Sequence, residues 1–349
     1  MAEFRMDKNE SAEVFEKNKE SRFPALQASP HLRRGSGTRA IMGNVLLALL
    51  PATLGSVWFF GPAVLPYYLV AVFFALAADA LAQFLRKRRV DTFDLSPVVT
   101  GVLLAMSMPL GTPLWFAALG PALGILVAKE LFGGIGYNFL NPALLGRAVL
   151  RLAFPQQMSM NPAPSPPFGL GQSVDAVASA TPLITLKEGG TLSAADLLDS
   201  FLGMAAGKIG ETSALLLLLG AVWLLAKGII RLRIPLAFLA GIALMAFVFG
   251  GNEGLFGAGW QTVLGHLLGG ATMLGAFFMV TDYGSSPSAP LAQILFGALC
   301  GVVTMLFRLY SPFPEGFTFA VLIVNFSVPL LNRVIRPRVL GEKNRSLLS

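Results

Sequence analysis

Apolar runs of near-spanning length recur along this chain from Ile41 almost to its C-terminus. The hydrocarbon core of a bilayer is about 30 Å thick, so a helix needs roughly 17–25 apolar residues to cross it. Of the 349 residues, 54% are hydrophobic and 13% charged, against about 25% charged in ordinary soluble domains. We therefore expect an all-α polytopic membrane protein with about ten transmembrane helices. The expected segments are 42–60, 63–85, 95–109, 113–132, 139–154, 213–231, 234–250, 262–280, 290–307 and 317–335.

Two stretches of this kind, 96–109 and 138–154, are short and interrupted by Gly and Pro. Such interruptions predict discontinuous helices beside a binding site. The stretch NFLNPALLGR at 138–147 also resembles NFSVPLLNR at 325–333, since each contains Asn-Phe, a Pro, a Leu pair and an Arg. The sequence leaves open whether this match reflects two inverted five-helix repeats or chance similarity between apolar segments.

Lys and Arg residues gather in four clusters, at 33–39, 86–89, 227–233 and 333–345. With ten spans all four clusters lie on one side, which the positive-inside rule assigns to the cytoplasm. The net charge of +7 is therefore a topology signal, and we expect no nucleic-acid partner. We expect a multi-pass protein of the bacterial plasma (inner) membrane with both termini cytoplasmic. Its parts would be a tail at 1–40, membrane half 1 at 41–154, an extracytoplasmic loop at 155–212, membrane half 2 at 213–335 and a tail at 336–349.

The metal-ligating and redox-active residue types are few. The one cysteine, Cys300, excludes an internal disulfide, and an iron–sulfur or CxxC zinc site built from this chain alone. The two histidines, His31 and His266, are far apart in the sequence, and we expect no metal site. A phosphate-binding loop and a nicotinamide fingerprint are both missing from the sequence, so we assign no catalytic residue and expect no complete active site on this chain.

The most unusual polar stretch is DAVASATP at 175–182, in the expected outer loop. Asp175 and Thr181 are six residues apart, and only small residues and one valine separate them. The residue before a proline is pushed out of the helical region, so Thr181 is predicted to stand on an exposed bend. Small neighbours would let a bulky enzyme or cofactor approach its hydroxyl. From residue types alone, an ordinary extracytoplasmic loop is the favoured interpretation.

This stretch resembles the flavinylation motif Asp-x-x-Ser/Thr-Gly-Ala-Thr of Rnf and Nqr respiratory complexes. Asp175, Ala180 and Thr181 match it, while Ala178 and Ser179 stand where the motif has Ser/Thr and Gly. In the motif a flavin transferase esterifies the final threonine with the phosphate of FMN. The resemblance therefore implies covalent FMN on Thr181, with Asp175, Ser179 and Ala180 as the surrounding motif positions.

Three further stretches resemble the RnfD/NqrB family: SPHLRRGSGTRAIMGNVLLALLPA at 29–52, LNPALLGRAVLRLAFP at 140–155 and GAFFMVTDYGSSP at 275–287. Membership would imply a membrane electron-transfer subunit of an Rnf-type ferredoxin:NAD⁺ oxidoreductase. That complex couples electron flow to movement of Na⁺ or H⁺, so this chain would be an enzyme subunit with other Rnf subunits as partners. Some family members also carry a second, non-covalent flavin, which the sequence does not place.

Arg147 and Arg151 lie one helical turn apart, so they share a helix face. They either extend to the membrane interface or neutralise the FMN phosphate or an anionic reduced flavin, because Arg offers a fixed fork of donors. Asn141, together with Pro142, is expected to break the helix and free backbone groups for the cofactor. These three polar residues are therefore candidate cofactor-binding residues.

Asp79 lies inside the second segment. A carboxylate within a membrane segment is a functional candidate by default, so Asp79 is a candidate for the ion path, with solvation at the inner interface as the alternative. A second Gly-Ala-Thr ends at Thr272, but it lies in an apolar segment with His266 in place of the aspartate. We therefore expect Thr181, not Thr272, to carry the flavin.

Two other functions remain open at this point. The first is an NqrB-like subunit of a Na⁺-translocating NADH:quinone reductase, which length and the N-terminal region disfavour. The second is an inverted-repeat channel or solute transporter without a redox role. Ten spans in two halves suit a transporter, but DAVASATP at 175–182 would have no purpose in it.

Overall fold

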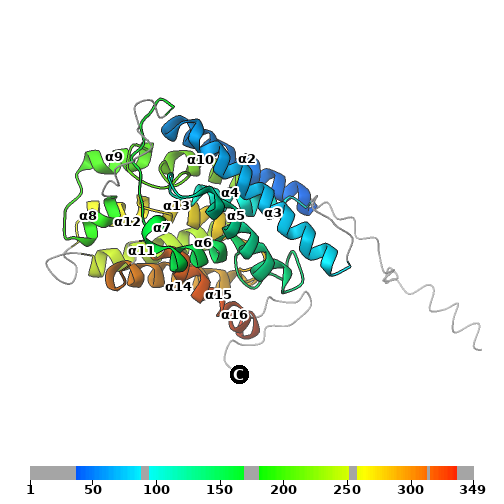
Figure 1. Cartoon of the computed structure of the whole chain (residues 1–349). Coiled ribbons are helices and arrows are strands. Elements are labelled where there is room, and N and C mark those ends of the chain that lie inside the picture. Colours follow the sequence, from blue (N-terminus) through cyan, green and yellow to red (C-terminus); the bar gives the residue numbers. More distant parts are fainter. Residues whose placement is uncertain (1–36, 88–93, 169–180, 251–257, 313–314, 336–349) are drawn as a thin grey trace, which may run out of the picture. The chain divides into compact units, whose positions relative to one another are not determined.

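The computed structural model describes residues 37–87, 94–168, 181–250, 258–312 and 315–335. The chain divides into two units, Met1–Gly37 and Thr38–Ser349, and the described helices belong to the second. The regular elements in the described residues are helices (Figure 1). This agrees with the predicted all-α class.

The helices follow the apolar segments of the sequence in order. The first group is α2 (Thr38–Phe60), η2 (Pro62–Val64), α3 (Leu65–Leu85), α4 (Ser96–Met106), α5 (Leu114–Gly124), η3 (Ile125–Glu130), α6 (Pro142–Ala153) and α7 (Pro155–Met158). Two short helices follow, α8 (Pro182–Lys187) and α9 (Ala194–Leu202). The last group is α10 (Ala214–Ala226), α11 (Arg233–Phe249), α12 (Trp260–Leu268), α13 (Thr272–Leu274), η4 (Gly275–Met279), α14 (Pro290–Tyr310), α15 (Phe317–Asn325) and α16 (Val328–Val334).

Three helices among the described residues are long and apolar enough to cross a membrane: Thr38–Phe60, Pro62–Leu85 and Pro290–Tyr310. Two bent pairs would raise the count to five if each pair is one span. The helices α4, α10 and α11 are apolar but shorter. Each of the ten expected segments thus contains helix, but several are well short of a full span. These lengths and compositions fit a multi-pass helical membrane protein.

Several of the apolar segments are broken. α4 and α6 have 11 and 12 residues, about half the length needed to cross a bilayer. The pair Trp260–Leu268 and Thr272–Met279 bends by 64° at Gly269 and Gly270, a break that the sequence patterns above do not predict. The two stretches that resemble each other each enter a short helix, because 138–147 leads into α6 and 325–333 runs from the end of α15 into α16.

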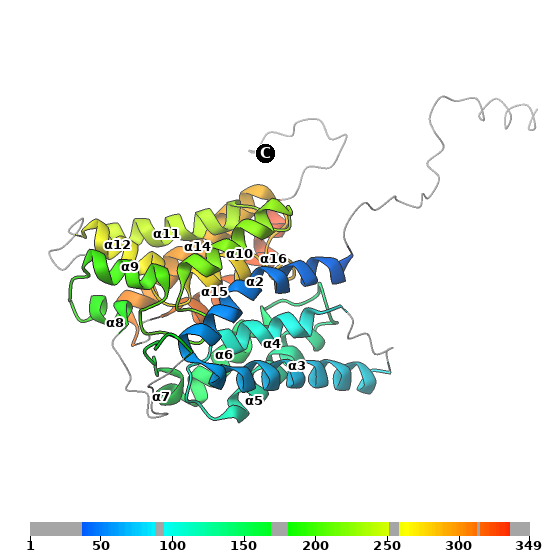
Figure 2. The same cartoon turned by 90° about the horizontal axis from the view of Figure 1, so that it is seen from above.

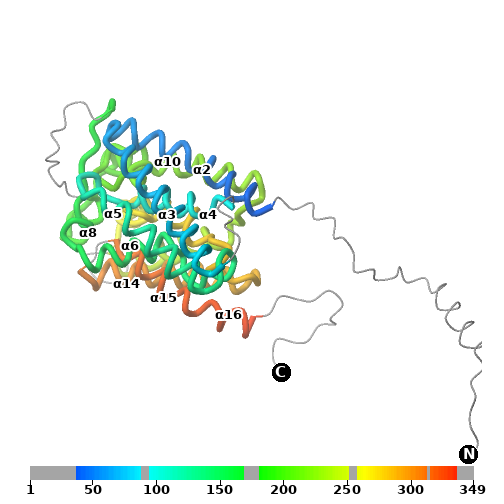
Figure 3. Tube along the Cα trace, turned by 45° about the vertical axis from the view of Figure 1, so that its right-hand side comes forward, coloured from blue at the N-terminus to red at the C-terminus, as the bar shows by residue number. Residues whose placement is uncertain are grey.

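The helices pack in two similar sets. α3 contacts α4 and α5, and α5 contacts α6; likewise α11 contacts α12 and α14, and α14 contacts α15. Figure 2 shows α3 and α5 on one side and α11 and α14 on the other. The two sets contact each other through α6 and α15, and the helices that precede the sets, α2 and α10, lie side by side (Figure 3).

Small residues allow the closest of these contacts. A Cβ at Gly146 of α6 would overlap the carbonyl oxygen of Gly120 in α5. A Cβ at Gly220 of α10 would overlap the carbonyl oxygen of Ala48 in α2. Close backbone approach at small residues is typical of helix pairs in membranes. It places α6, which carries several candidate site residues, firmly against its neighbours.

Candidate functional site

Thr181 is the N-cap residue of α8 and precedes Pro182. Its backbone is extended, with φ −82° and ψ 156°, the geometry that a following proline favours. Thr181 Oγ1 accepts a hydrogen bond from Ile184 N at 3.3 Å, which is longer than the usual N–H···O distance. The Thr181 side chain is half-buried, whereas the sequence predicted an exposed position. The hydroxyl is therefore only weakly held by its own helix.

The Thr181 side chain lines a small cavity, which we call the Thr181 cavity. α8 and α9 both contact α12, and the three helices lie together at one end of the molecule's second unit (Figure 1). The walls of the cavity include Ser200 of α9, Gly269 after α12, and the carboxylate residues Glu211 and Glu315. Residues far apart in the sequence thus surround the predicted flavin-bearing threonine. The motif positions Asp175, Ser179 and Ala180 lie outside the described residues.

Two of these walls belong to a buried charge cluster, defined here as Arg147, Arg151, Lys208, Glu211 and Glu315. Arg147 donates to Glu211 Oε1 at 2.7 Å and to Glu315 Oε2 at 2.6 Å. Lys208 pairs with Glu315, and Arg151 donates to the carbonyl of Met158. The Arg147 side chain is only 3% exposed, so Arg147 does not extend to the membrane interface. Its partners hold it inside the protein.

Among the described residues, the charge cluster combines three cations with two carboxylates. Burial outweighs the attraction of Glu315 and lowers the pKa of Lys208 to about 8. Burial also opposes ionisation of Glu315, but Lys208, Arg147 and Arg151 outweigh it and hold the pKa of that carboxyl below its usual range. Each carboxylate that lines the Thr181 cavity is thus paired with a cation of the cluster.

The alternative threonine, Thr272, is in a different environment. It is fully buried, and its hydroxyl lies 2.7 Å from Gly269 O and accepts from Arg308 Nη2 at 2.6 Å. Arg308 also donates to the carbonyl of His266 at 2.5 Å. Thr272 and Arg308 together donate hydrogen bonds to the backbone carbonyls of His266 and Gly269 at the break after α12. This hydroxyl has a structural partner on each side and no route to solvent.

A second cavity lies at the start of α6, and we call it the Asn141 cavity. Asn141 is the N-cap of α6, and its Oδ1 accepts from two backbone N–H groups of that helix, at 3.0 and 3.2 Å. Its Nδ2 donates to the carbonyl of Met279 at 3.1 Å, at the end of η4. Asn138 Nδ2 donates to Asp282 Oδ2 at 2.9 Å. Two asparagines therefore link the broken segment before α6 to the end of the π-helix η4.

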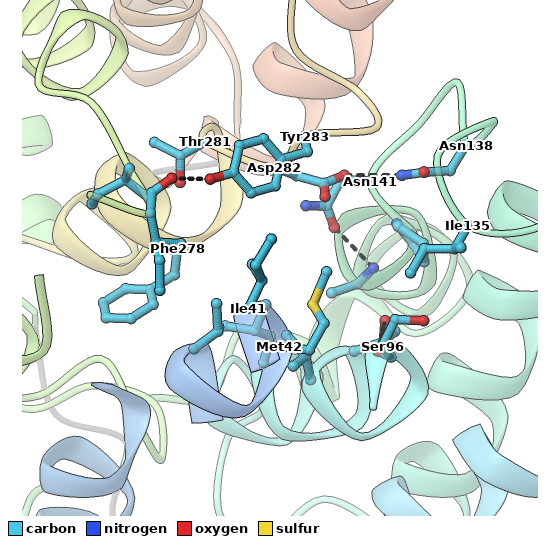
Figure 4. A pocket seen from close by; sticks show the side chains of 18 of the residues that line it. Ile41, Met42, Ser96, Ile135, Asn138, Asn141, Phe278, Thr281, Asp282 and Tyr283 are labelled. Carbon is cyan, nitrogen blue, oxygen red and sulfur yellow. Dashed lines mark hydrogen bonds between the residues drawn. The ribbon is translucent and has the colours of Figure 1, made fainter. Parts of the chain in front are cut away.

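The walls of the Asn141 cavity are mainly apolar, with a few polar groups at one side (Figure 4). Ile41 and Met42 of α2 and Phe278 of η4 form part of the apolar wall. Thr281 and Asp282 lie on the polar side. Burial raises the pKa of the Asp282 carboxyl, against the opposing effect of its hydrogen bonds. An apolar cleft with a few convergent polar groups is the usual form of a site for an organic cofactor.

Asp79 is fully buried in α3, so solvation at the interface does not account for it. Its Oδ1 accepts from Lys129 Nζ at 2.7 Å, and its Oδ2 accepts from Gln83 Nε2 at 2.8 Å. Lys129 lies in the π-helix η3 and also lines the Asn141 cavity. An intramembrane carboxylate with a cationic partner is typical of ion and proton pathways.

Several charged or polar residues of these sites are absent from the sequence-based assignment: Lys129, Asn138, Lys208, Glu211, Asp282, Arg308 and Glu315. Lys208 and Glu211 fall in a short Gly-containing stretch before α10, and Glu315 precedes the last apolar segment. The sequence does show a carboxylate just before each of two apolar segments, which could have marked these residues as site candidates. The cations that pair with these carboxylates, however, are distant in the sequence. The structure connects Thr181 to Arg147 through Glu211 and Glu315, which line the Thr181 cavity and pair with Arg147, whereas Asn141 caps the start of α6.

Comparison with known proteins agrees with the motifs. The model of the NQR2, RnfD, RnfE family matches residues 25–341. The D subunit of the Na(+)-translocating ferredoxin:NAD(+) oxidoreductase complex of Acetobacterium woodii is 41% identical over 318 residues, covering 90% of this chain and 95% of that protein. The D subunits of the ion-translocating oxidoreductase complexes of Escherichia fergusonii and Escherichia coli K12 are 35% and 36% identical, each covering 91% of this chain and 98% of the relative. As its sequence motifs predict, the chain belongs to the NQR2, RnfD, RnfE family.

Proposed function

We propose that this chain is the membrane electron-transfer subunit of an Rnf-type ferredoxin:NAD⁺ oxidoreductase that couples electron flow to translocation of Na⁺ or H⁺. Family membership and the names of the three relatives support the complex. All three relatives are named as the D component of their complex, which favours the Rnf complex over the NADH:quinone reductase. The other Rnf subunits would supply the sites for ferredoxin and NAD⁺.

The proposed cofactor is FMN joined to Thr181 through a phosphoester bond, formed by a flavin transferase. The position of Thr181 supports this assignment, because it is extended before Pro182, stands at the N-terminus of α8 and lines a cavity. The flavin would supply the electron-carrying chemistry, while this chain supplies its position and electrostatics.

A second, non-covalent flavin is proposed for the Asn141 cavity. The apolar walls suit an aromatic ring system, and the amide, hydroxyl and carboxyl groups of Asn141, Thr281 and Asp282 suit its polar edge. Asn141 and Arg151 are ten positions apart on or next to α6, which is about 15 Å along a helix. The two proposed flavins would then lie at opposite ends of one short helix.

The proposed membrane arrangement has ten segments in two halves of opposite orientation. The matching contacts of α3 to α6 and of α11 to α15 support two related halves. The basic clusters of the sequence support cytoplasmic termini and an outer position for residues 155–212. The Thr181 cavity would then face the outer side, where the flavin transferase acts, in the bacterial plasma (inner) membrane.

Substitution of the threonine tests the covalent flavin. Thr181→Val keeps the β-branched shape and deletes the oxygen, so the chain should fold and insert without covalent flavin. Thr185→Val and Thr272→Val are matched controls that should keep it. In the native protein, the peptide that contains Thr181 should be heavier by one FMN less one water, measured by mass spectrometry. An unmodified peptide from cells with an active flavin transferase would refute the assignment to Thr181. Complete absence of flavin from the protein would favour the alternative of a channel or transporter without a redox role.

A further inference from the structure

The buried carboxylate Asp79 and the Asn141 cavity share one side chain, Lys129. Both oxygens of Asp79 are occupied, one by Lys129 Nζ at 2.7 Å and the other by Gln83 Nε2 at 2.8 Å. The same ammonium group lies 3.5 Å from Asp94 Oδ2. Lys129 is 4% exposed and Asp79 is fully buried, so neither has bulk water to replace a lost partner. The ammonium therefore provides the main counter-charge for Asp79.

The second contact of Lys129 is with the cavity. Lys129 lines the Asn141 cavity together with Ser96, whose hydroxyl lies 3.2 Å from Asp94 Oδ2. The cavity is thus lined by Lys129 itself and is linked to Asp94 through the hydroxyl of Ser96. Lysine is a compact charge on a flexible four-carbon stem, so its ammonium can shift between neighbouring anions. A charge placed in the cavity would act on the same ammonium that neutralises Asp79.

Among the described residues, the ion group around Lys129 has more carboxylates than cations. Its carboxylates are Asp79, Asp94 and Glu130, and its cations are Lys129 and Arg86, which lies 3.5 Å from Glu130. Three negative charges therefore face two positive ones. Lys129 and Glu130 belong to the π-helix η3 (Ile125–Glu130), a helix type that is rare and occurs frequently at functional sites. A group with this balance favours uptake of one further cation.

We propose that Lys129 couples the charge of the occupant of the Asn141 cavity to cation uptake at Asp79. The proposal rests on the second flavin proposed above. An electron delivered by the oxidoreductase complex adds one negative charge beside Lys129, and the ammonium moves toward it. Asp79 Oδ1 then loses its counter-charge, and an uncompensated buried carboxylate is costly. Asp79 takes up one Na⁺ or H⁺, so one electron is matched by one cation; removal of the electron returns the ammonium and releases the cation.

The test uses the full chain with Thr181→Val, so that the non-covalent flavin is the only flavin bound. Its midpoint potential is measured by reductive titration at rising Na⁺ and constant pH and ionic strength, and separately at varied pH and constant Na⁺. One cation per electron predicts a rise of about 59 mV for each tenfold increase in that cation. Because a flavin takes up protons of its own, the pH series is judged by the difference from the Asp79→Asn variant.

Lys129→Met and Asp79→Asn should each abolish this dependence, and Lys129→Arg, which keeps the charge, should retain it. Where Lys129→Met does not fold, Lys129→Gln replaces it with the same expectation. The coupling is overturned if Lys129→Met keeps the full dependence, or if the potential with Lys129 intact responds to neither cation. A Thr181→Val chain that retains no flavin at all overturns the second flavin and the coupling with it, whereas retained flavin with an unresponsive potential overturns the coupling alone.

Discussion

Arg147 is a buried cation that forms two ion pairs. Its guanidinium donates to Glu211 and Glu315 at 2.7 and 2.6 Å. Arg147→Met removes both bonds and keeps a flexible chain in the space. Glu315 retains Lys208 as a partner, but Glu211 loses its only salt bridge among the described residues. The variant therefore leaves Glu211, 2% exposed, without a direct ion-pair partner among the described residues.

The expected loss of stability follows from this geometry. Removing one partner of a buried ion pair costs about 3–5 kcal/mol, because the other charge is left uncompensated. Two charge-assisted hydrogen bonds at about 1.5–3 kcal/mol each lead to a similar value. Adding Glu211→Gln removes the stranded charge. The double variant Arg147→Met/Glu211→Gln should therefore be less destabilised than the sum of the single variants, by about 0.5–3 kcal/mol.

The chain contains its own probe for this measurement. Cys300 is the one cysteine and is fully buried, so it reacts with a thiol-specific dye only when the protein opens. The detergent-solubilised chain and its variants are heated with the dye, and the temperatures of half-reaction are compared. Arg231→Met is the matched control, because Arg231 is exposed.

The expected order of stability is Arg231→Met close to the unsubstituted chain and Arg147→Met well below it. The double variant should lie above the value that additivity predicts. If Arg147→Met opens at the same temperature as Arg231→Met, the charge cluster does not hold the fold. If the double variant loses the full sum, the stranded carboxylate is not the cause of the loss.

Two further outcomes test topology and protonation. Ala195→Cys, in a Cys300→Ala background, places a thiol at an exposed position of α9 without disturbing the Ser193–Asp196 capping box. An impermeant thiol reagent should label this cysteine in intact cells. Labelling only after lysis would place the Thr181 cavity on the cytoplasmic side. The pKa of Lys208 is lowered to about 8 from its ordinary value of 10.5 because burial penalises the ammonium, so between these values the unfolded chain binds more protons than the folded one and stability rises with pH. The difference in opening temperature between the chain and Lys208→Met should therefore move in favour of the unsubstituted chain from about pH 8 to about pH 10, and a shift in the opposite direction would contradict the lowered pKa.

Local features of the fold could be predicted from the sequence because their causes are local. Long apolar runs demand helices, whose backbone groups satisfy one another away from water. Pro182 restricts the residue before it, and Thr181 is indeed extended. Asn141 before Pro142 predicted an interrupted helix, and Asn141 caps the start of α6. Family membership also followed from short motifs, which the relatives confirm.

The partners of the buried charges were decided only by tertiary structure. Arg147 pairs with residues 64 and 168 positions away, and Lys129 with a carboxylate 50 positions away. A charge in a low-dielectric interior must have a partner, so a sequence can show that Arg147 needs one. Which carboxylate meets it depends on how short, broken helices pack, and helical periodicity carries no information on that. The groups of cations and carboxylates at Arg147 and at Asp79 therefore exist only in the folded chain.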